Sequence, residues 1–185
     1  MPGCAGSSHR SYVVVREAAR VQELGDLRGT RFAINEADSN SGMNLPRRLF
    51  APLARQGRFF GSTVVTGGHA ASAALVLSGG ADAAAIDCVT FALLRRYRPA
   101  AVHGLRVLAE TAATATPPLV TSRRTTAELV TALRRVLAEV MRCELYAPVR
   151  EALFLESVDF CDEDAYGVVM EYEGDAQRLG YPVLA

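Results

Sequence analysis

The sequence contains a run of short polar residues that could bind an anion. Ser39, Asn40, Ser41 and Gly42 stand directly before a stretch of helical character. Free backbone N–H groups, hydroxyl donors and the positive end of a helix dipole suit a tetrahedral oxyanion, and a glycine lets the backbone approach it. A serine at this position can equally be an ordinary N-cap. The motif alone leaves both alternatives open.

Two further polar residues follow later strand-like runs. His69 comes after two glycines at the start of a helical stretch, and Asp87 ends the apolar run 81–86. His69 could donate to the same anion or be an exposed residue at a helix start, and Asp87 could face a ligand or cap the next helix. In an open parallel sheet, ligands bind beyond the carboxyl ends of the strands. Because all three positions fall at such ends, we favour one shared binding site.

A strand, a loop and a helix recur three times in this region. We expect strands at 31–35, 62–66 and 81–86, followed by helices at 43–57, 70–78 and 89–98. Parallel neighbours need crossover connections of this length. The sequence therefore predicts an α/β protein with a parallel sheet built from βα units.

Pro46 lies inside the first of these helices. Beyond the first turn, a proline removes one backbone hydrogen bond and clashes with the preceding turn, at a cost of about 3 kcal/mol. One alternative is that the helix restarts at Pro46. Residues 39–42 would then form a loop nest of N–H groups, and anion affinity should fall.

The flanking regions show further strand patterns. A β-branched run at 11–16 and short apolar runs at 105–108 and 119–122 are typical of strands. The segment 110–118, rich in Ala, Thr and Pro, lies between the last two runs and is the nearest feature to a hinge.

The C-terminal part of the chain is expected to be helical. Residues 125–142 predict a long helix with Thr125 or Thr126 as its N-cap, and two shorter helices and a tail should follow. An apolar stripe at helical spacing marks one face of the long helix: Leu129, Leu133, Val136, Leu137 and Val140.

The composition excludes several classes of partner and chemistry. Twenty basic residues, all of them Arg, balance twenty acidic ones, so no net charge favours nucleic acid or a membrane surface. The lack of Lys excludes Schiff-base and Walker-type chemistry. No stretch reaches the roughly 20 apolar residues of a membrane span, and the N-terminus as written has no export signal.

The cysteines and the order of polar residues give no sign of a metal site, a cofactor or catalysis. Cys4, Cys88, Cys143 and Cys161 are spaced irregularly, without a C-x-x-C pair or a His at ligand spacing, so we expect unpaired structural thiols. No Ser–His–acid order and no G-x-S-x-G elbow stands out. We therefore expect a protein that is not an enzyme.

Several segments resemble the phosphate, phosphite and phosphonate substrate-binding proteins of ABC importers. They are RSYVVVR, LRGTRFAINEADSNSGMN, the long run FFGSTVVTGGHAASAALVLSGGADAAAIDCVTFALLRR and the terminal LGYP. The most specific parts are the S-x-S-G helix start, the G-G-H opening of the next helix and the ADAAAID segment. The resemblance covers nearly the whole chain.

This resemblance implies a type II periplasmic-binding fold, in which two α/β lobes joined by crossing strands close on a ligand. It implies that Ser39, Asn40, Ser41 and His69 bind the phosphorus oxyanion and that Asp87 faces its substituent or the hinge. Three divisions follow: 1–29, with SYVVVR as the first crossing strand; 30–110, a complete ligand-binding lobe; and 111–185, with LVTS as the return strand and C-terminal helices of an incomplete second lobe.

The implied function is that of a solute-binding component, with a small oxyanion as ligand and an ABC permease as partner. A periplasmic or lipid-anchored location is expected for the family. Members begin with an export signal and then roughly half of the first lobe, so about a hundred residues would be missing from this chain, given typical domain sizes. The alternatives are an anion-sensing regulatory domain of the same fold and a gene fragment that binds nothing.

Overall fold

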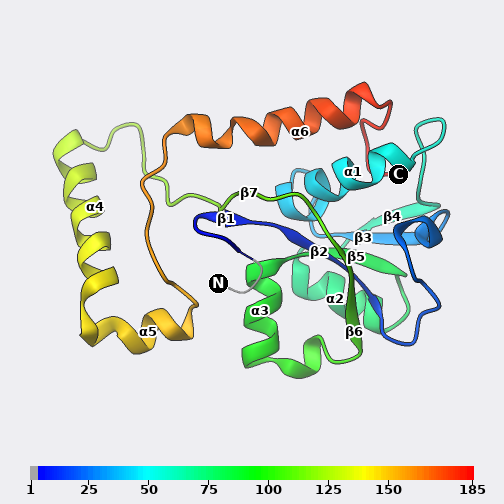
Figure 1. The fold of residues 1–185 in the computed structure, drawn as a ribbon, viewed down its shortest axis with the longest axis horizontal. Helices are drawn as coiled ribbons and strands as arrows, with labels where there is room; N and C mark the ends of the chain where they lie inside the picture. Colours follow the sequence, from blue (N-terminus) through cyan, green and yellow to red (C-terminus); the bar gives the residue numbers. More distant parts are fainter. Residues whose placement is uncertain (1–3) are drawn as a thin grey trace.

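A five-stranded sheet lies at the centre of the molecule (Figure 1). The computed structural model describes residues 4–185, without the side chain of Glu163. β3 runs parallel to both of its neighbours, β4 and β5, whereas β2 runs antiparallel to β5 and β6. The strand order across the sheet is β4-β3-β5-β2-β6, with bounds β2 Ser11–Arg16, β3 Arg31–Ile34, β4 Ser62–Val65, β5 Ala83–Asp87 and β6 Leu105–Glu110.

The α/β class and the three predicted βα units are confirmed, but the sheet is mixed. Only β3, β4 and β5 form the parallel part, and β2 lies between β5 and β6 in the opposite direction. The three consecutive valines of β2, Val13 to Val15, are fully buried. A strand that is apolar on both faces belongs in the middle of a covered sheet, which explains the central position of β2.

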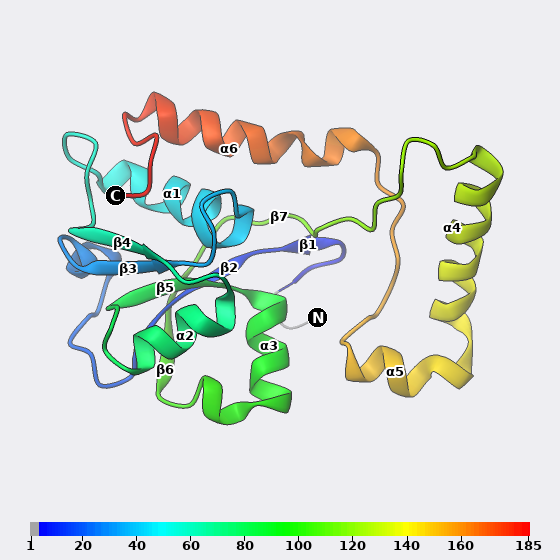
Figure 2. The ribbon, with the colours of Figure 1, turned by 180° about the vertical axis from the view of Figure 1, so that it is seen from behind.

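Helices cover both faces of the sheet (Figure 2). α2 (His69–Leu77) and α3 (Cys88–Tyr97) pack on one face, and α1 (Leu45–Phe50) and α6 (Gly167–Arg178) pack on the other. Alternate side chains of a strand point to opposite faces, so Val14 joins the α2–α3 core whereas Val13 and Val15 join the α1–α6 core. The second core also contains the aromatic residues Phe32, Phe50, Phe59, Phe60 and Tyr181.

α6 is held to α1 by polar contacts as well as by this core. The buried guanidinium of Arg47 donates to the Asn44 side chain at 2.7 Å and to the Pro182 carbonyl at 2.7 Å, and it lies 3.4 Å from Glu173. Arg48 bonds Asp175 at 3.1 Å. The last helix and the tail therefore pack on the sheet, although the division of the chain at residue 110 groups them with another lobe.

The predicted return strand at 119–122 does not form. Leu119 and Val120 are each 82% exposed, and their segment contains no strand. The preceding Pro117 and Pro118 have no N–H to donate. A short strand forms earlier in the chain instead. It is β7 (Thr114–Ala115), which lies inside the predicted hinge segment 110–118 and pairs antiparallel with β1 (Ser8–His9).

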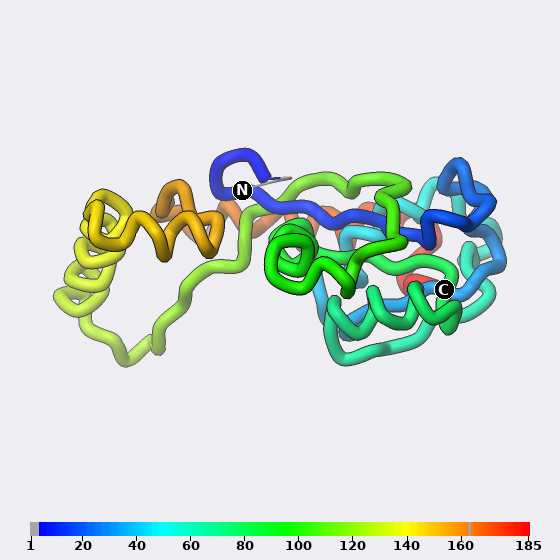
Figure 3. Tube along the Cα trace, turned by 90° about the horizontal axis from the view of Figure 1, so that it is seen from below, coloured from blue at the N-terminus to red at the C-terminus, as the bar shows by residue number. Residues whose placement is uncertain are grey.

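The segment 116–160 forms an arm that stands away from the sheet (Figures 1 and 3). It contains α4 (Ala127–Arg142), which Thr126 caps by accepting from the Leu129 amide at 3.3 Å, and α5 (Ala147–Ala152). None of the sixteen residues of α4 is buried. The arm contacts the body where Arg96 and Tyr97 of α3 donate to backbone carbonyls of α5.

The remaining helical elements are single turns. They are η1 Leu24–Leu27, η2 Asn40–Asn44, η3 Ala51–Leu53, η4 Pro99–Ala101, η5 Glu144–Tyr146 and η6 Glu163–Tyr166. No helix in the described part of the chain is both long enough and apolar enough to span a membrane.

Candidate functional site

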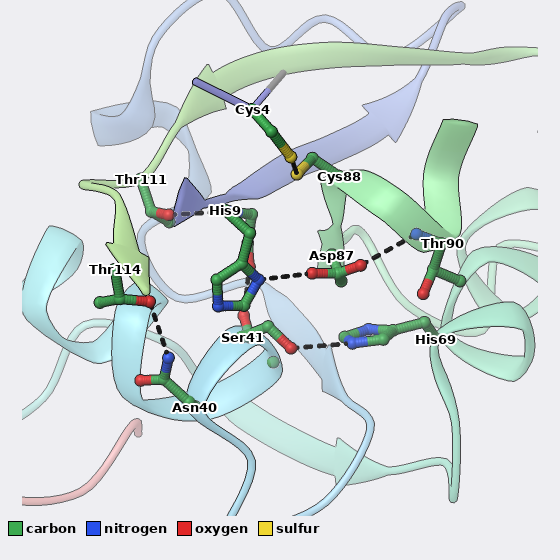
Figure 4. A network of polar contacts seen from close by, with 12 residues as sticks. Cys4, His9, Asn40, Ser41, His69, Asp87, Cys88, Thr90, Thr111 and Thr114 are labelled. Carbon is green, nitrogen blue, oxygen red and sulfur yellow. Dashed lines mark hydrogen bonds and ion pairs between the residues drawn. The ribbon is translucent and has the colours of Figure 1, made fainter. Parts of the chain in front are cut away.

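The polar residues picked out from the sequence gather at the carboxyl ends of β3, β4 and β5 (Figure 4). Ser41 follows β3, and His69 opens the helix after β4. The Ser41 hydroxyl oxygen lies 3.0 Å from Nε2 of His69. The ends of β3 and β4 therefore converge, as expected, and the side chains that follow them are in direct contact.

Ser39 caps the turn that carries Ser41. Its hydroxyl accepts from the Gly42 amide at 3.0 Å, and its carbonyl accepts from the amides of Met43 and Asn44. These bonds wind residues Asn40–Asn44 into one wide π-helical turn. Ser39 is therefore the N-cap of this turn.

Pro46 explains how this turn joins α1. α1 begins at Leu45 with Pro46 in its first turn, where a missing N–H costs no helical bond. The restart near Pro46 is confirmed, and residues 39–42 form a wide helical turn instead of an open loop nest. In a π-helical turn each amide donates to the carbonyl five residues earlier. Pro46 has no N–H, so it cannot donate to the carbonyl of Ser41. The buried Ser11 hydroxyl donates to it instead, at 2.7 Å.

Asn40 and Gly42 hold the turn in place. Nδ2 of Asn40 donates to the Thr114 hydroxyl of β7 at 3.1 Å, and its Oδ1 accepts from Asn44 at 3.0 Å. At Gly42, a Cβ atom would lie 1.7 Å from Oδ1 of Asn35. Only a glycine fits there without displacing Asn35, so close backbone approach is required at this position.

His69 is a neutral hydrogen-bonding group in this environment. Burial lowers its pKa by penalising the charged imidazolium, and the opposing charge of Asp87 offsets only part of this shift. Its other ring nitrogen, Nδ1, is buried and has no hydrogen-bond partner in the described structure. A neutral imidazole with Nε2–H directed at Ser41 can donate one hydrogen bond toward the space between the two strand ends.

Asp87 is a capping residue that also forms a largely buried hydrogen bond with His9. Its Oδ1 accepts from the Thr90 amide at 2.9 Å, and its Oδ2 lies 2.7 Å from Nδ1 of His9. Burial on its own would raise the pKa of Asp87, but the bonds from His9 and Thr90 hold it below its ordinary value. Asp87 is therefore ionised at neutral pH with both oxygens engaged.

His9 is the residue of this site that the sequence reasoning missed. It is only 2% exposed and precedes β2. Because β2 runs antiparallel to β5, Ser11 pairs with Asp87, and the start of β2 meets the end of β5. The assumption of a wholly parallel sheet hid this contact, since it placed strand starts at the opposite edge. An antiparallel placement of SHRS would have revealed it.

The site offers neutral donors and one engaged carboxylate. Ser41 and His69 face each other, Asn40 is joined to Thr114, and Asp87 is joined to His9. In the described part of the chain, no three His, Cys, Asp or Glu side chains are grouped to hold a metal ion. Two shallow hollows, lined by residues such as Arg16 and Ala74, lie elsewhere. The binding role of the six predicted residues stays a prediction.

The fold is that of one lobe of a type II periplasmic binding protein. The sequence model of one family, described as ABC transporter, phosphonate, periplasmic substrate-binding protein, matches residues 4–166. The chain belongs to this family. No curated protein sequence matches it significantly.

Solved structures show the same fold. A binding-protein component of an ABC phosphonate transporter from Pseudomonas aeruginosa superposes with a TM-score of 0.81 at 18% identity, covering 94% of this chain and 59% of that one. PhnD1 from Prochlorococcus marinus, in complex with methylphosphonate, gives 0.72 at 17% identity, with 93% and 68% covered.

A Xanthomonas citri protein bound to ATP is a third structural neighbour. It gives a TM-score of 0.66 at 19% identity and covers 94% of this chain and 67% of that one. The chain thus spans 59 to 68% of the length of these three proteins. At such identities the likeness describes the fold and leaves the ligand open.

Proposed function

We propose that this chain is the ligand-gripping part of a solute-binding protein that delivers a phosphonate, phosphite or phosphate to an ABC importer without chemical turnover. The family match over residues 4–166 carries the proposal. The placement of neutral hydrogen-bond donors at the ligand edge of the sheet supports it.

In this proposal, Ser41 and His69 are the direct donors to the phosphorus oxyanion. Their side chains lie 3.0 Å apart, so an anion oxygen that enters between them would replace their mutual bond with two bonds to ligand. Ser39, Asn40 and Gly42 hold the turn that presents Ser41. Asp87 holds His9 in place beside the site through a hydrogen bond. Its negative charge favours protonation of His69 and so offsets part of the lowering of the His69 pKa by burial.

The partners and the location follow from the same proposal. The ligand is a small oxyanion, the protein partner is an ABC permease, and the family's site of action is the periplasm. A second lobe would close on the ligand from the side opposite Ser41 and His69. We assign α4 and α5, which stand away from the sheet, to that lobe.

Calorimetric titration with phosphite, methylphosphonate and phosphate tests the proposal. A hydrogen bond to a charged group contributes about 1.5–3 kcal/mol, so Ser41→Ala and His69→Ala should each weaken oxyanion binding by about 10- to 150-fold. Ser62→Ala and His103→Ala are matched controls, because both residues are exposed and lie outside the site. Their affinity should equal that of the unchanged protein.

Two results would contradict the proposal in different ways. If Ser41→Ala and His69→Ala bind the anion with the same affinity as the controls, Ser41 and His69 do not contact the ligand. The absence of heat with all three anions at millimolar concentration, from a chain that melts cooperatively, would show that this chain does not bind them.

A further inference from the structure

Two thiols lie in contact beside the candidate site. Sγ of Cys4 is 3.1 Å from Sγ of Cys88 (Figure 4), although the residues are 84 positions apart in the chain. Cys88 is fully buried and Cys4 is half-buried, and both are free thiols in the structure. Their spacing in the sequence gave no sign of this contact.

The surrounding backbone holds the two segments together. Cys88 is the first residue of α3, and its amide donates to the carbonyl of Arg10 at 3.0 Å. Its neighbour Asp87 bonds His9. On the other side, the Ser8 amide and hydroxyl both donate to the Ala5 carbonyl, and this turn folds the N-terminal segment back along β1. The contact between the sulfurs is therefore built by the fold.

We propose that Cys4 and Cys88 are a disulfide-forming pair that locks the N-terminal segment onto the start of α3. The two thiols lose two protons and two electrons as the S–S bond forms. A disulfide oxidant, either oxidised glutathione or a thiol–disulfide oxidoreductase, takes up the electrons and protons and leaves as two thiols. The sulfurs need to approach to about 2.05 Å, and rotation of the half-buried Cys4 side chain supplies this movement.

The environment of Cys4 sets how the reaction proceeds. Burial raises the pKa of Cys4 to about 12, and the hydrogen bond with Cys88 adds to this shift. Because the thiolate is the reacting form, the pair reacts slowly at neutral pH both with alkylating reagents and with disulfide oxidants, so the oxidation is carried out at alkaline pH. Disulfides persist in oxidising compartments such as the periplasm. The periplasmic location rests on the proposed function. The contact between the two sulfur atoms does not depend on it.

The bond would act on the site through His9. His9 lies between Cys4 and β2 and binds Asp87, the residue next to Cys88. A cross-link from Cys4 to Cys88 closes a loop that contains β1, β2, β3, β4 and β5. It therefore restrains the unfolded chain strongly and keeps His9 over Asp87.

Oxidation of the full chain tests the proposal. Cys143→Ser and Cys161→Ser remove the two exposed thiols, and the double variant is incubated with oxidised glutathione. We expect a mass loss of about 2 Da from two hydrogens and a tryptic species that joins residues 1–10 to residues 59–95. The melting temperature should rise by about 5 °C or more and fall again on reduction.

Cys4→Ser in the same background is the control, because Cys4 is only half-buried and its loss should be compatible with folding. It should show no cross-link and no oxidant-dependent melting shift. Recovery of free thiols or of glutathione adducts alone, in a folded protein with the unchanged Cys4–Cys88 pair, would overturn the proposal. The mass change and the shift in melting temperature are measured without ligand. A protein that fails to bind oxyanions can therefore still confirm or contradict the proposed disulfide.

Discussion

The sheet body and the arm at residues 116–160 use similar apolar residues in opposite ways. In the body, strands and helices bury a continuous set of Val, Ala and Phe side chains on both faces of the sheet. In α4, the stripe that includes Leu129, Leu133 and Val136 is 45–52% exposed. Regularly spaced apolar residues thus form a buried core in the body, whereas in α4 they form a stripe that is about half exposed. Amphipathic periodicity predicts a helix, but it does not reveal what the helix packs against.

Truncation of one apolar side chain in each region is the strongest test of this difference. Phe50 is fully buried among Phe32, Phe59 and Phe60, so Phe50→Ala should lower the free energy of unfolding by about 3–5 kcal/mol. Leu133→Ala in α4 should change it by less than about 0.5 kcal/mol. Urea unfolding followed by circular dichroism measures both. A cost above about 2 kcal/mol for Leu133→Ala would mean that α4 is packed in solution.

The elements that the sequence predicted well are those specified by neighbouring residues. The three βα units, the Thr126 cap and the restart of α1 near Pro46 follow from local patterns and are found at or near the expected positions. The failures depend on pairing between distant segments. The run 119–122 has strand character but no partner strand, because β1 pairs with β7 instead.

The candidate site shows the same division. Ser41 and His69 were found because each follows a strand of the parallel part. His9 and the Cys4–Cys88 contact were not found, because they depend on the antiparallel position of β2 and join residues 78 and 84 positions apart. The direction of one strand therefore decided which site residues could be recognised.

Removal of Asp87 should have the second-largest effect, confined to the body. Asp87→Ala deletes the N-cap of α3 and leaves His9 buried without its partner, so we expect a loss of about 2–4 kcal/mol. Asp38→Ala, at an exposed position in the loop after β3, is the matched control and should be nearly neutral. Equal stability of the two variants in urea titrations would show that the His9–Asp87 pair does not stabilise the folded protein.

The pH dependence of stability should also arise in the body. Burial lowers the pKa of His69, so below about pH 6.5 the unfolded chain binds a proton that the folded chain does not. Stability should therefore fall between pH 7 and pH 5, by at most about 1.4 kcal/mol per pH unit for this group. The lowered pKa of Asp87 acts in a separate window, with its contribution present above about pH 4 and lost on further acidification.

His69→Gln isolates the first of these windows. It should flatten the stability profile between pH 7 and pH 5, whereas His103→Gln, at an exposed position, should leave that profile unchanged. Melting temperatures measured across this range provide the comparison. An equally steep decline in His69→Gln would assign the pH dependence to another group.

The smallest expected effect concerns the arm and tests whether it opens independently of the body. Thr126→Ala removes the hydroxyl that accepts from the Leu129 amide, and such a cap contributes about 1 kcal/mol to its helix. If α4 opens without the body, as its exposed surface indicates, amide hydrogen exchange in α4 should accelerate by about fivefold. Exchange in β2 and β5 should stay unchanged, because these strands are buried in the sheet. Accelerated exchange in both regions would join the arm and the body in one cooperative unit and remove the distinction between them.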